Sequence, residues 1–154
     1  MEKKKSIYTK SREEKFAEKA DSGYGVCLTQ TCPQREHCLH WLLRTYVPKD
    51  RYYTHSVNLN NPQTQTEKCP LYMKDRPIRM PLGISNIYYD MPERIAKPLK
   101  QHLISHFNRK RYYEYHSGYR PVPPEHEQYI LQAIERYGWS NPVSFNGYVE
   151  DYIW

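Results

Sequence analysis

Apolar side chains recur at helical spacing in several stretches of this chain. Residues 33–46, 92–108 and 124–137 each carry apolar positions three or four residues apart, which predicts a helix over each stretch. Prolines stand near the start of these stretches and Gly138 follows the third, as is typical of helix starts and stops. The apolar residues of segment 145–153 have the same offsets, so we expect a short helix there as well.

Other segments alternate between apolar and polar positions, which favours β structure. Residues 52–57 and 84–89 are short alternating segments, and they predict two strands. Residues 112–122, with the sequence YYEYHSGYRPV, alternate on both sides of Ser117-Gly118, which predicts a hairpin. Together with the helices, these segments predict an α+β fold that is mainly helical.

Charged residues dominate the first 22 positions, where large apolar side chains are few. A segment of this kind buries little surface, so we expect residues 1–22 to form a flexible charged tail. Residues 23–154 are then expected to form a small single domain that is held together by a four-cysteine metal site. The length of 154 residues agrees with one domain.

The beginning of the chain, MEKKKSIYTK, has basic residues but no apolar stretch behind them, which argues against a secretory signal peptide. No run approaches the roughly 18 apolar residues of a membrane-spanning helix. We therefore expect an intracellular, cytoplasmic protein with no membrane partner.

Tyrosine changes the interpretation of a composition that is otherwise poor in core residues. The chain has 16 Tyr and 3 Trp, and 14% of its residues are aromatic. Disordered chains are poor in aromatic residues, so we expect a folded core built from amphipathic rings.

The basic residues are unevenly distributed along the chain. The formal net charge is +6, yet residues 68–120 alone hold 11 basic and 4 acidic groups. Residues 121–154 hold 1 basic and 5 acidic groups. This asymmetry favours either a face that binds a polyanion or an internal pairing of the basic middle with the acidic end.

Four cysteines provide the clearest candidate chemistry. Cys27, Cys32, Cys38 and Cys69 follow the pattern C-x4-C-x5-C-x30-C-P. Four thiolates are the right number of ligands for a tetrahedral zinc ion or for an iron–sulfur cluster, and the spacing leaves the choice between them open. Buried free thiols and a redox pair are the alternatives, because buried cysteine is common in protein cores.

A basic and aromatic segment is the candidate nucleic-acid interface. Cations that neutralise phosphates stand there beside rings that stack on bases, which is the combination that RNA or single-stranded DNA binding needs. If the segment is a strand, only one of two adjacent tyrosines faces outward. The alternative is structural, with cations at a helix end and tyrosines in the core. The candidate residues are Arg109, Lys110, Arg111, Tyr112, Tyr113 and Arg120.

Several segments, taken together, resemble one small bacterial family of tyrosine-rich proteins with four cysteines, a domain family of unknown function. The segments are CLTQTCPQREHCLHWLLR, CPLY, HFNRKRYYEYHSGYRP, PPEHEQYI and FNGYVEDYIW. The resemblance implies an intracellular bacterial protein with no assigned activity. It supplies no catalytic residue.

The sequence also lacks the common catalytic motifs. We find no G-x-S-x-G, no phosphate-binding loop and no dinucleotide-binding glycine pattern, and the chain has only 6 Gly. We therefore expect a metal-stabilised binding module rather than an enzyme, associated with nucleic acid in a regulatory role. The alternative is a protein–protein adaptor with a tyrosine-rich interaction surface.

Overall fold

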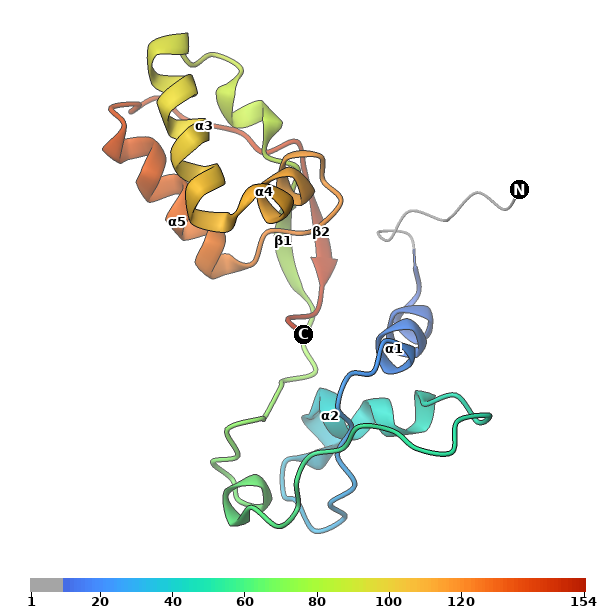
Figure 1. Cartoon of the computed structure of the whole chain (residues 1–154). Coiled ribbons are helices and arrows are strands. Elements are labelled where there is room, and N and C mark those ends of the chain that lie inside the picture. The colour runs from blue at the N-terminus through green and yellow to red at the C-terminus, as the bar shows by residue number, and fades with distance from the viewer. Residues whose placement is uncertain (1–9) are drawn as a thin grey trace, which may run out of the picture. The chain divides into compact units, whose positions relative to one another are not determined.

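The computed structural model describes residues 10–154, which gather into two compact units (Figure 1). Unit 1 contains the chain up to Arg76 together with Trp154, and unit 2 contains Pro77–Ile153. The sequence predicted one domain over 23–154, whereas the contacts within the chain divide after Arg76. The architecture is α+β and mainly helical, as predicted.

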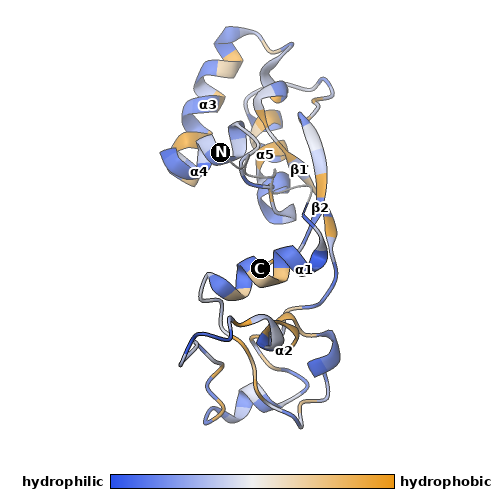
Figure 2. Ribbon diagram, turned by 90° about the vertical axis from the view of Figure 1, so that its right-hand side faces the viewer, coloured by the Kyte–Doolittle hydropathy of each residue, from blue (hydrophilic) through white to orange (hydrophobic). Residues whose placement is uncertain are grey.

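Unit 1 begins with the helix α1 (Arg12–Asp21). Ser11 caps it, because its side chain accepts a hydrogen bond from the amide of Glu14 while the Glu14 carboxylate accepts one from the amide of Ser11. Hydrophilic positions run along much of this helix in Figure 2, but Phe16 and Ala20 are almost fully buried.

The helix α1 differs from the flexible tail predicted over residues 1–22. The Phe16 ring makes edge-to-face contacts with the rings of Tyr46 and Trp154, with centroids 5.5 and 5.8 Å apart. Such aromatic contacts stabilise a helix that has few aliphatic residues. Residues 1–9 of the predicted tail lie outside the described residues.

The helix predicted over 33–46 is broken into short turns. These are a 3₁₀ turn at Arg35–His37, the four-residue α2 (Leu39–Leu42) and a 3₁₀ turn at Leu43–Tyr46. Cys38 interrupts the helix with extended backbone angles, because it forms an antiparallel bridge with Lys74. The strand predicted over 52–57 is reduced to one bridge between Val26 and Ser56.

Unit 2 contains a two-stranded antiparallel sheet, which pairs β1 (Ile78–Leu82) near its start with β2 (Gly147–Asp151) near its end. The helix predicted over 145–153 is therefore wrong. Gly147 weakens a helix, and residues 147–151 form backbone hydrogen bonds with β1 instead. Segment 84–89 is likewise not a strand, and a 3₁₀ turn occupies Ser85–Tyr88.

Three helices pack on one another to form the core of unit 2. The helices α3 (Glu93–Phe107) and α5 (Pro124–Arg136) confirm the predictions over 92–108 and 124–137. Between them, α4 (Arg109–His116) replaces the predicted hairpin over 112–122. None of the helices in the described part of the chain is long and apolar enough to cross a membrane. The fully buried core residues include Leu99, Leu103, Tyr112, Tyr115, Val122 and Ile130.

The break between α3 and α4 depends on Asn108. Its backbone has φ 64° and ψ 161°, a strained conformation that residues with a side chain rarely adopt. Its side-chain oxygen accepts a hydrogen bond from the amide of Arg111, so the residue that ends α3 also caps the first turn of α4.

Candidate functional site

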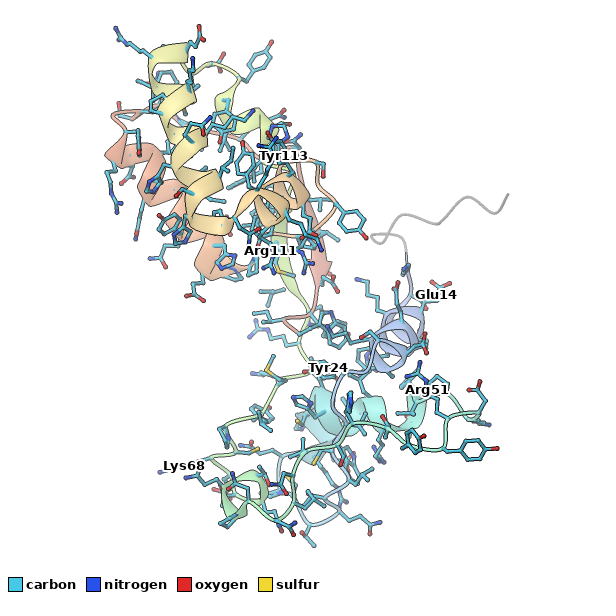
Figure 3. The ribbon with its side chains drawn as sticks, in the orientation of Figure 1. Glu14, Tyr24, Arg51, Lys68, Arg111 and Tyr113 are labelled. Atoms are coloured by element: carbon cyan, nitrogen blue, oxygen red, sulfur yellow. The ribbon has the colours of Figure 1, made fainter. Side chains whose placement is uncertain are left out.

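All four predicted cysteine ligands line one small cavity in unit 1. The cavity measures about 20 Å³, and Cys27, Cys32, Cys38 and Cys69 reach it from separate segments of the chain. Cys27 and Cys38 are buried, whereas Cys32 and Cys69 are partly exposed. The sulfur atoms of unit 1 are yellow in Figure 3, which labels Lys68, the residue before Cys69.

Cys32 lies where two successive turns meet. Its amide donates to the carbonyl of Thr29 at 3.5 Å, and its carbonyl accepts from the amide of Arg35 at 3.3 Å. The proline at position 33 follows directly, and proline suits the second position of such a turn. The cysteine is thereby held at the junction of two turns.

Cys69 has the same local structure. Its amide donates to the carbonyl of Thr66 and its carbonyl accepts from the amide of Tyr72, both at 3.1 Å. The two loops also share a sequence, because residues 29–33 are TQTCP and residues 66–70 are TEKCP. This duplicated T-x-x-C-P motif is a signal that our sequence analysis did not use.

Cys27 and Cys38 are held by backbone pairing between segments. The amide of Cys27 donates to the carbonyl of His40 at 2.8 Å. The bridge between Cys38 and Lys74 brings the strand-like segment that follows Cys69 beside the segment that carries Cys38. The Cys27 thiol lies 3.5 Å from the hydroxyl of Thr29, at the start of the Cys32 loop. These hydrogen bonds explain how cysteines far apart in sequence reach one cavity.

His40 and Tyr24 form a stacked pair beside the cysteines. The rings are nearly parallel with centroids 4.6 Å apart, and the Tyr24 hydroxyl lies 3.2 Å from Nε2 of His40. Nδ1 of His40 is hydrogen-bonded to the carbonyl of Gly25, which only accepts, so Nδ1 carries the proton. Burial, with a smaller contribution from nearby Cys38, raises the pKa of Tyr24 to about 12.

Gln34 adds an unsatisfied polar atom to the lining of the cavity. Its side-chain oxygen is buried and has no hydrogen-bond partner among residues 10–154. Within the same described part of the chain, no three His, Cys, Asp or Glu side chains are close enough together to form a complete set of metal ligands. The cysteines share a cavity without being arranged as ligands.

Most of the basic and aromatic segment lies on α4 in unit 2, Arg120 follows that helix, and the six residues separate into three groups. Arg109, Lys110 and Tyr113 line an open hollow of about 590 Å³, together with Tyr119. Tyr113 is 39% exposed and Tyr119 is 62% exposed, so both rings are accessible. Figure 3 labels Tyr113 and Arg111 on this helix.

Tyr112 belongs to the core instead. It is fully buried, and its hydroxyl lies 3.1 Å from the hydroxyl of Tyr88. A buried ring does not stack on a base, so the assignment of Tyr112 to a nucleic-acid interface is corrected. Tyr113 remains as the accessible member of the pair, because the segment is a helix in which adjacent side chains point in different directions.

Arg111 and Arg120 are paired with an acidic residue. Both guanidinium groups approach the carboxylate of Glu114, at 3.7 and 2.7 Å respectively. The hydrogen bond from Arg120 is the main cause of a lowered pKa of Glu114. These two arginines are therefore less available to a phosphate than Arg109 and Lys110.

The fold and the cavity define a small α+β protein that brings four cysteines to one place. Its sequence matches, over residues 3–154, a family described as a family of unknown function (DUF6078), and the chain belongs to that family. No curated protein matches the chain, and no solved structure matches it either.

Proposed function

We propose that this protein is a zinc-stabilised binding module, with Cys27, Cys32, Cys38 and Cys69 as the ligands. The observation that carries this proposal is that all four cysteines line one small cavity. No three of their thiols stand close enough together among residues 10–154 to ligate an ion, so a bound ion would have to draw them inward. Zinc is the proposed ion because a closed set of four thiolates is typical of its structural sites, and metal analysis distinguishes it from an iron–sulfur cluster.

The duplicated cysteine loops support the same proposal. In each loop the cysteine is the first residue of a proline-containing turn, and the other two cysteines come from backbone segments that are paired with neighbours. Four thiolates are a closed ligand set for tetrahedral zinc, which is typical of structural sites. A bound ion would join the segments of unit 1 that carry the four cysteines.

Metal analysis of the purified full-length protein tests this proposal. We expect about one zinc per chain, and we expect Cys69→Ser to lose the metal and to lower the melting temperature strongly, since structural zinc contributes on the order of 10–16 kcal/mol in zinc-finger peptides. Thr31→Ser is the matched control, because it changes the exposed neighbour of Cys32 and keeps every thiol.

Two results would contradict the zinc site. One is a metal-free protein whose four single Cys→Ser variants melt like the wild type. The other is protein that contains iron and sulfide with visible absorption, which would replace zinc by a cluster.

We infer that the module binds single-stranded nucleic acid, RNA or DNA, at the hollow beside α4. Arg109 and Lys110 are exposed and would neutralise phosphates, while Tyr113 and Tyr119 would stack on bases. The guanidinium of Arg109 lies 5.6 Å from the centre of the Tyr113 ring, so a short stretch of nucleic acid can contact a cation and a ring together. Base stacking of this kind is worth roughly 1–3 kcal/mol per base.

Fluorescence anisotropy with labelled single-stranded oligonucleotides tests the nucleic-acid site. The double variant Arg109→Ala/Lys110→Ala should weaken binding at every sequence and reduce the slope of log K against log salt by roughly 1.4, at about 0.7 per phosphate contact. Arg94→Ala/Lys97→Ala is the control, because it removes two exposed cations from α3 outside the hollow.

A wild-type protein that binds neither RNA nor single-stranded DNA at low salt would contradict the nucleic-acid proposal. It would favour the protein–protein adaptor. The observation behind that second candidate is the pair Tyr52 and Tyr53, which are 99% and 89% exposed. Replacing both by Ser would then abolish capture of the protein partner and leave the melting temperature unchanged.

A further inference from the structure

Unit 2 contains a second concave site, distinct from the hollow beside α4. It measures about 260 Å³ and opens between residues 86–90 and residues 139–144. Ile87 and Val143 contribute apolar side chains to its lining. Ile87 belongs to the core of unit 2, and Val143 packs against that core. The lining also contains two aromatic rings, from Tyr89 and Trp139, and the carboxylate of Asp90.

The two segments that form this site are fixed to each other by Asn146. Its amide donates to the carbonyl of Gly83 at 3.0 Å, and its side-chain oxygen accepts from the amide of Asn86 at 3.0 Å. Its side-chain nitrogen donates to the hydroxyl of Ser85 at 2.6 Å. Three hydrogen bonds from one residue therefore hold the site open before any ligand arrives, which lowers the cost of binding.

Gly83 is required for this close approach. Its φ is +80°, and a Cβ atom at this position would come within 2.8 Å of the Asn146 side chain. Both facts exclude a larger residue, so the backbone of this turn is specialised for holding Asn146.

The side chains of the site favour a cation. Asp90 is exposed and has no ion-pair partner among residues 10–154, and Tyr89 beside it is 86% exposed. Aromatic faces attract cations, and an unpaired carboxylate adds a direct counter-charge.

We propose that this site binds the guanidinium group of an arginine side chain. A guanidinium is planar, so it stacks on an aromatic ring while it donates two hydrogen bonds to one carboxylate, which the round ammonium of lysine does not. The volume of about 260 Å³ lies just below the roughly 300–1,000 Å³ of sites for drug-sized ligands, so the site has room for a group as small as one side chain. In this arrangement Asp90 accepts the hydrogen bonds, and Trp139 or Tyr89 provides the stacking face.

Titration of the isotope-labelled full-length protein, followed by NMR, tests this proposal with three probes. These are N-acetyl-arginine amide, the tripeptide Gly-Arg-Gly and N-acetyl-lysine amide. We expect both arginine probes to shift the Trp139 indole signal, and to bind at least fivefold more tightly than the lysine probe. Tighter binding of the tripeptide would identify the ligand as a peptide segment, and equal binding would identify a free guanidinium compound.

Two variants connect the binding to the named residues. Asp90→Asn should weaken arginine binding at least tenfold, whereas Glu93→Gln, which removes a nearby exposed carboxylate outside the site, should change it less than twofold. Trp139→Leu and Tyr89→Ala each remove one aromatic ring from the site. Tyr89→Ala is the variant to use if Trp139→Leu disturbs folding, because Tyr89 is exposed. No shift at millimolar arginine, or binding that survives Asp90→Asn, would overturn the proposal without affecting the zinc or nucleic-acid sites.

Discussion

The hydroxyl groups of Tyr88 and Tyr112 lie 3.1 Å apart at the edge of the unit 2 core. Tyr112 comes from α4 and Tyr88 from the 3₁₀ turn before α3, so one hydrogen bond joins two elements. Burial is the main cause that raises the pKa of both tyrosines.

Breaking this hydrogen bond should destabilise unit 2. We expect Tyr88→Phe to lower the free energy of unfolding by about 1 kcal/mol, because it leaves the Tyr112 hydroxyl without its partner. Tyr113→Phe, at an exposed neighbouring position, should leave the stability unchanged. Urea denaturation followed by circular dichroism measures both, and equal midpoints for the two variants would contradict the prediction.

The raised pKa of Tyr24 predicts a loss of stability at alkaline pH. The phenol ionises near pH 10 in the unfolded chain and at about 12 in the folded protein. The unfolded state therefore binds fewer protons between these values, and the contribution of Tyr24 to stability is complete below pH 10 and is lost as pH rises to 12. Thermal melts from pH 9 to 11 should show a steeper decline for wild type than for Tyr24→Phe. Parallel melting-temperature curves for wild type and Tyr24→Phe would contradict this prediction.

His126 predicts the opposite dependence at acidic pH. Burial is the largest of the causes that lower its pKa below the usual 6.5, and the Tyr115 hydroxyl lies 2.7 Å from its Nδ1. The unfolded state then binds more protons near and below pH 6.5, so the stability of unit 2 falls as pH falls through that region. Replacing His126 by Gln should flatten the change in urea midpoint between pH 7.5 and 5.5. His37→Gln, at an exposed position, should retain it.

The burial of Phe16 predicts that α1 contributes to the stability of unit 1. Phe16→Ala should cost about 3–5 kcal/mol, because it removes a ring that is 1% exposed and packed against Tyr46 and Trp154. Ala17→Ser, on the exposed face of the same helix, is the control. Limited proteolysis gives an independent measurement, and rapid cleavage within residues 12–21 of the wild type would argue for a tail instead.

The sequence was informative where one local signal agreed with the packing. In α3, Leu99, Leu103 and Phe107 recur at helical spacing and all three are buried, so the prediction was confirmed even though Pro98 removes one backbone hydrogen bond. In α4, Tyr112 and Tyr115 are three residues apart and both buried, yet the neighbouring aromatic and polar residues also alternate. The shorter period suggested a hairpin, and Asn108 as a shared cap was not recognised.

Long-range pairing decided the elements that the sequence did not reveal. Residues 147–151 have helical offsets, but their partner β1 lies far earlier in the chain. The same reason hid the proposed arginine site, because Asp90 and Trp139 meet only through the fold. The metal site predicted on the four cysteines stays a prediction, because they line one cavity but their thiols are not gathered as ligands among residues 10–154.

The pairing of β1 with β2 has a mechanical consequence. Ile78 pairs with Asp151 where the chain enters and leaves unit 2, and Leu82 pairs with Gly147 at the opposite end of the ladder. A pulling force between residues 77 and 153 would therefore act on the Ile78–Asp151 pair first, and then on each following pair in turn. Strands loaded in this way separate one pair at a time, so under tension unit 2 would begin to open at the Ile78–Asp151 pair.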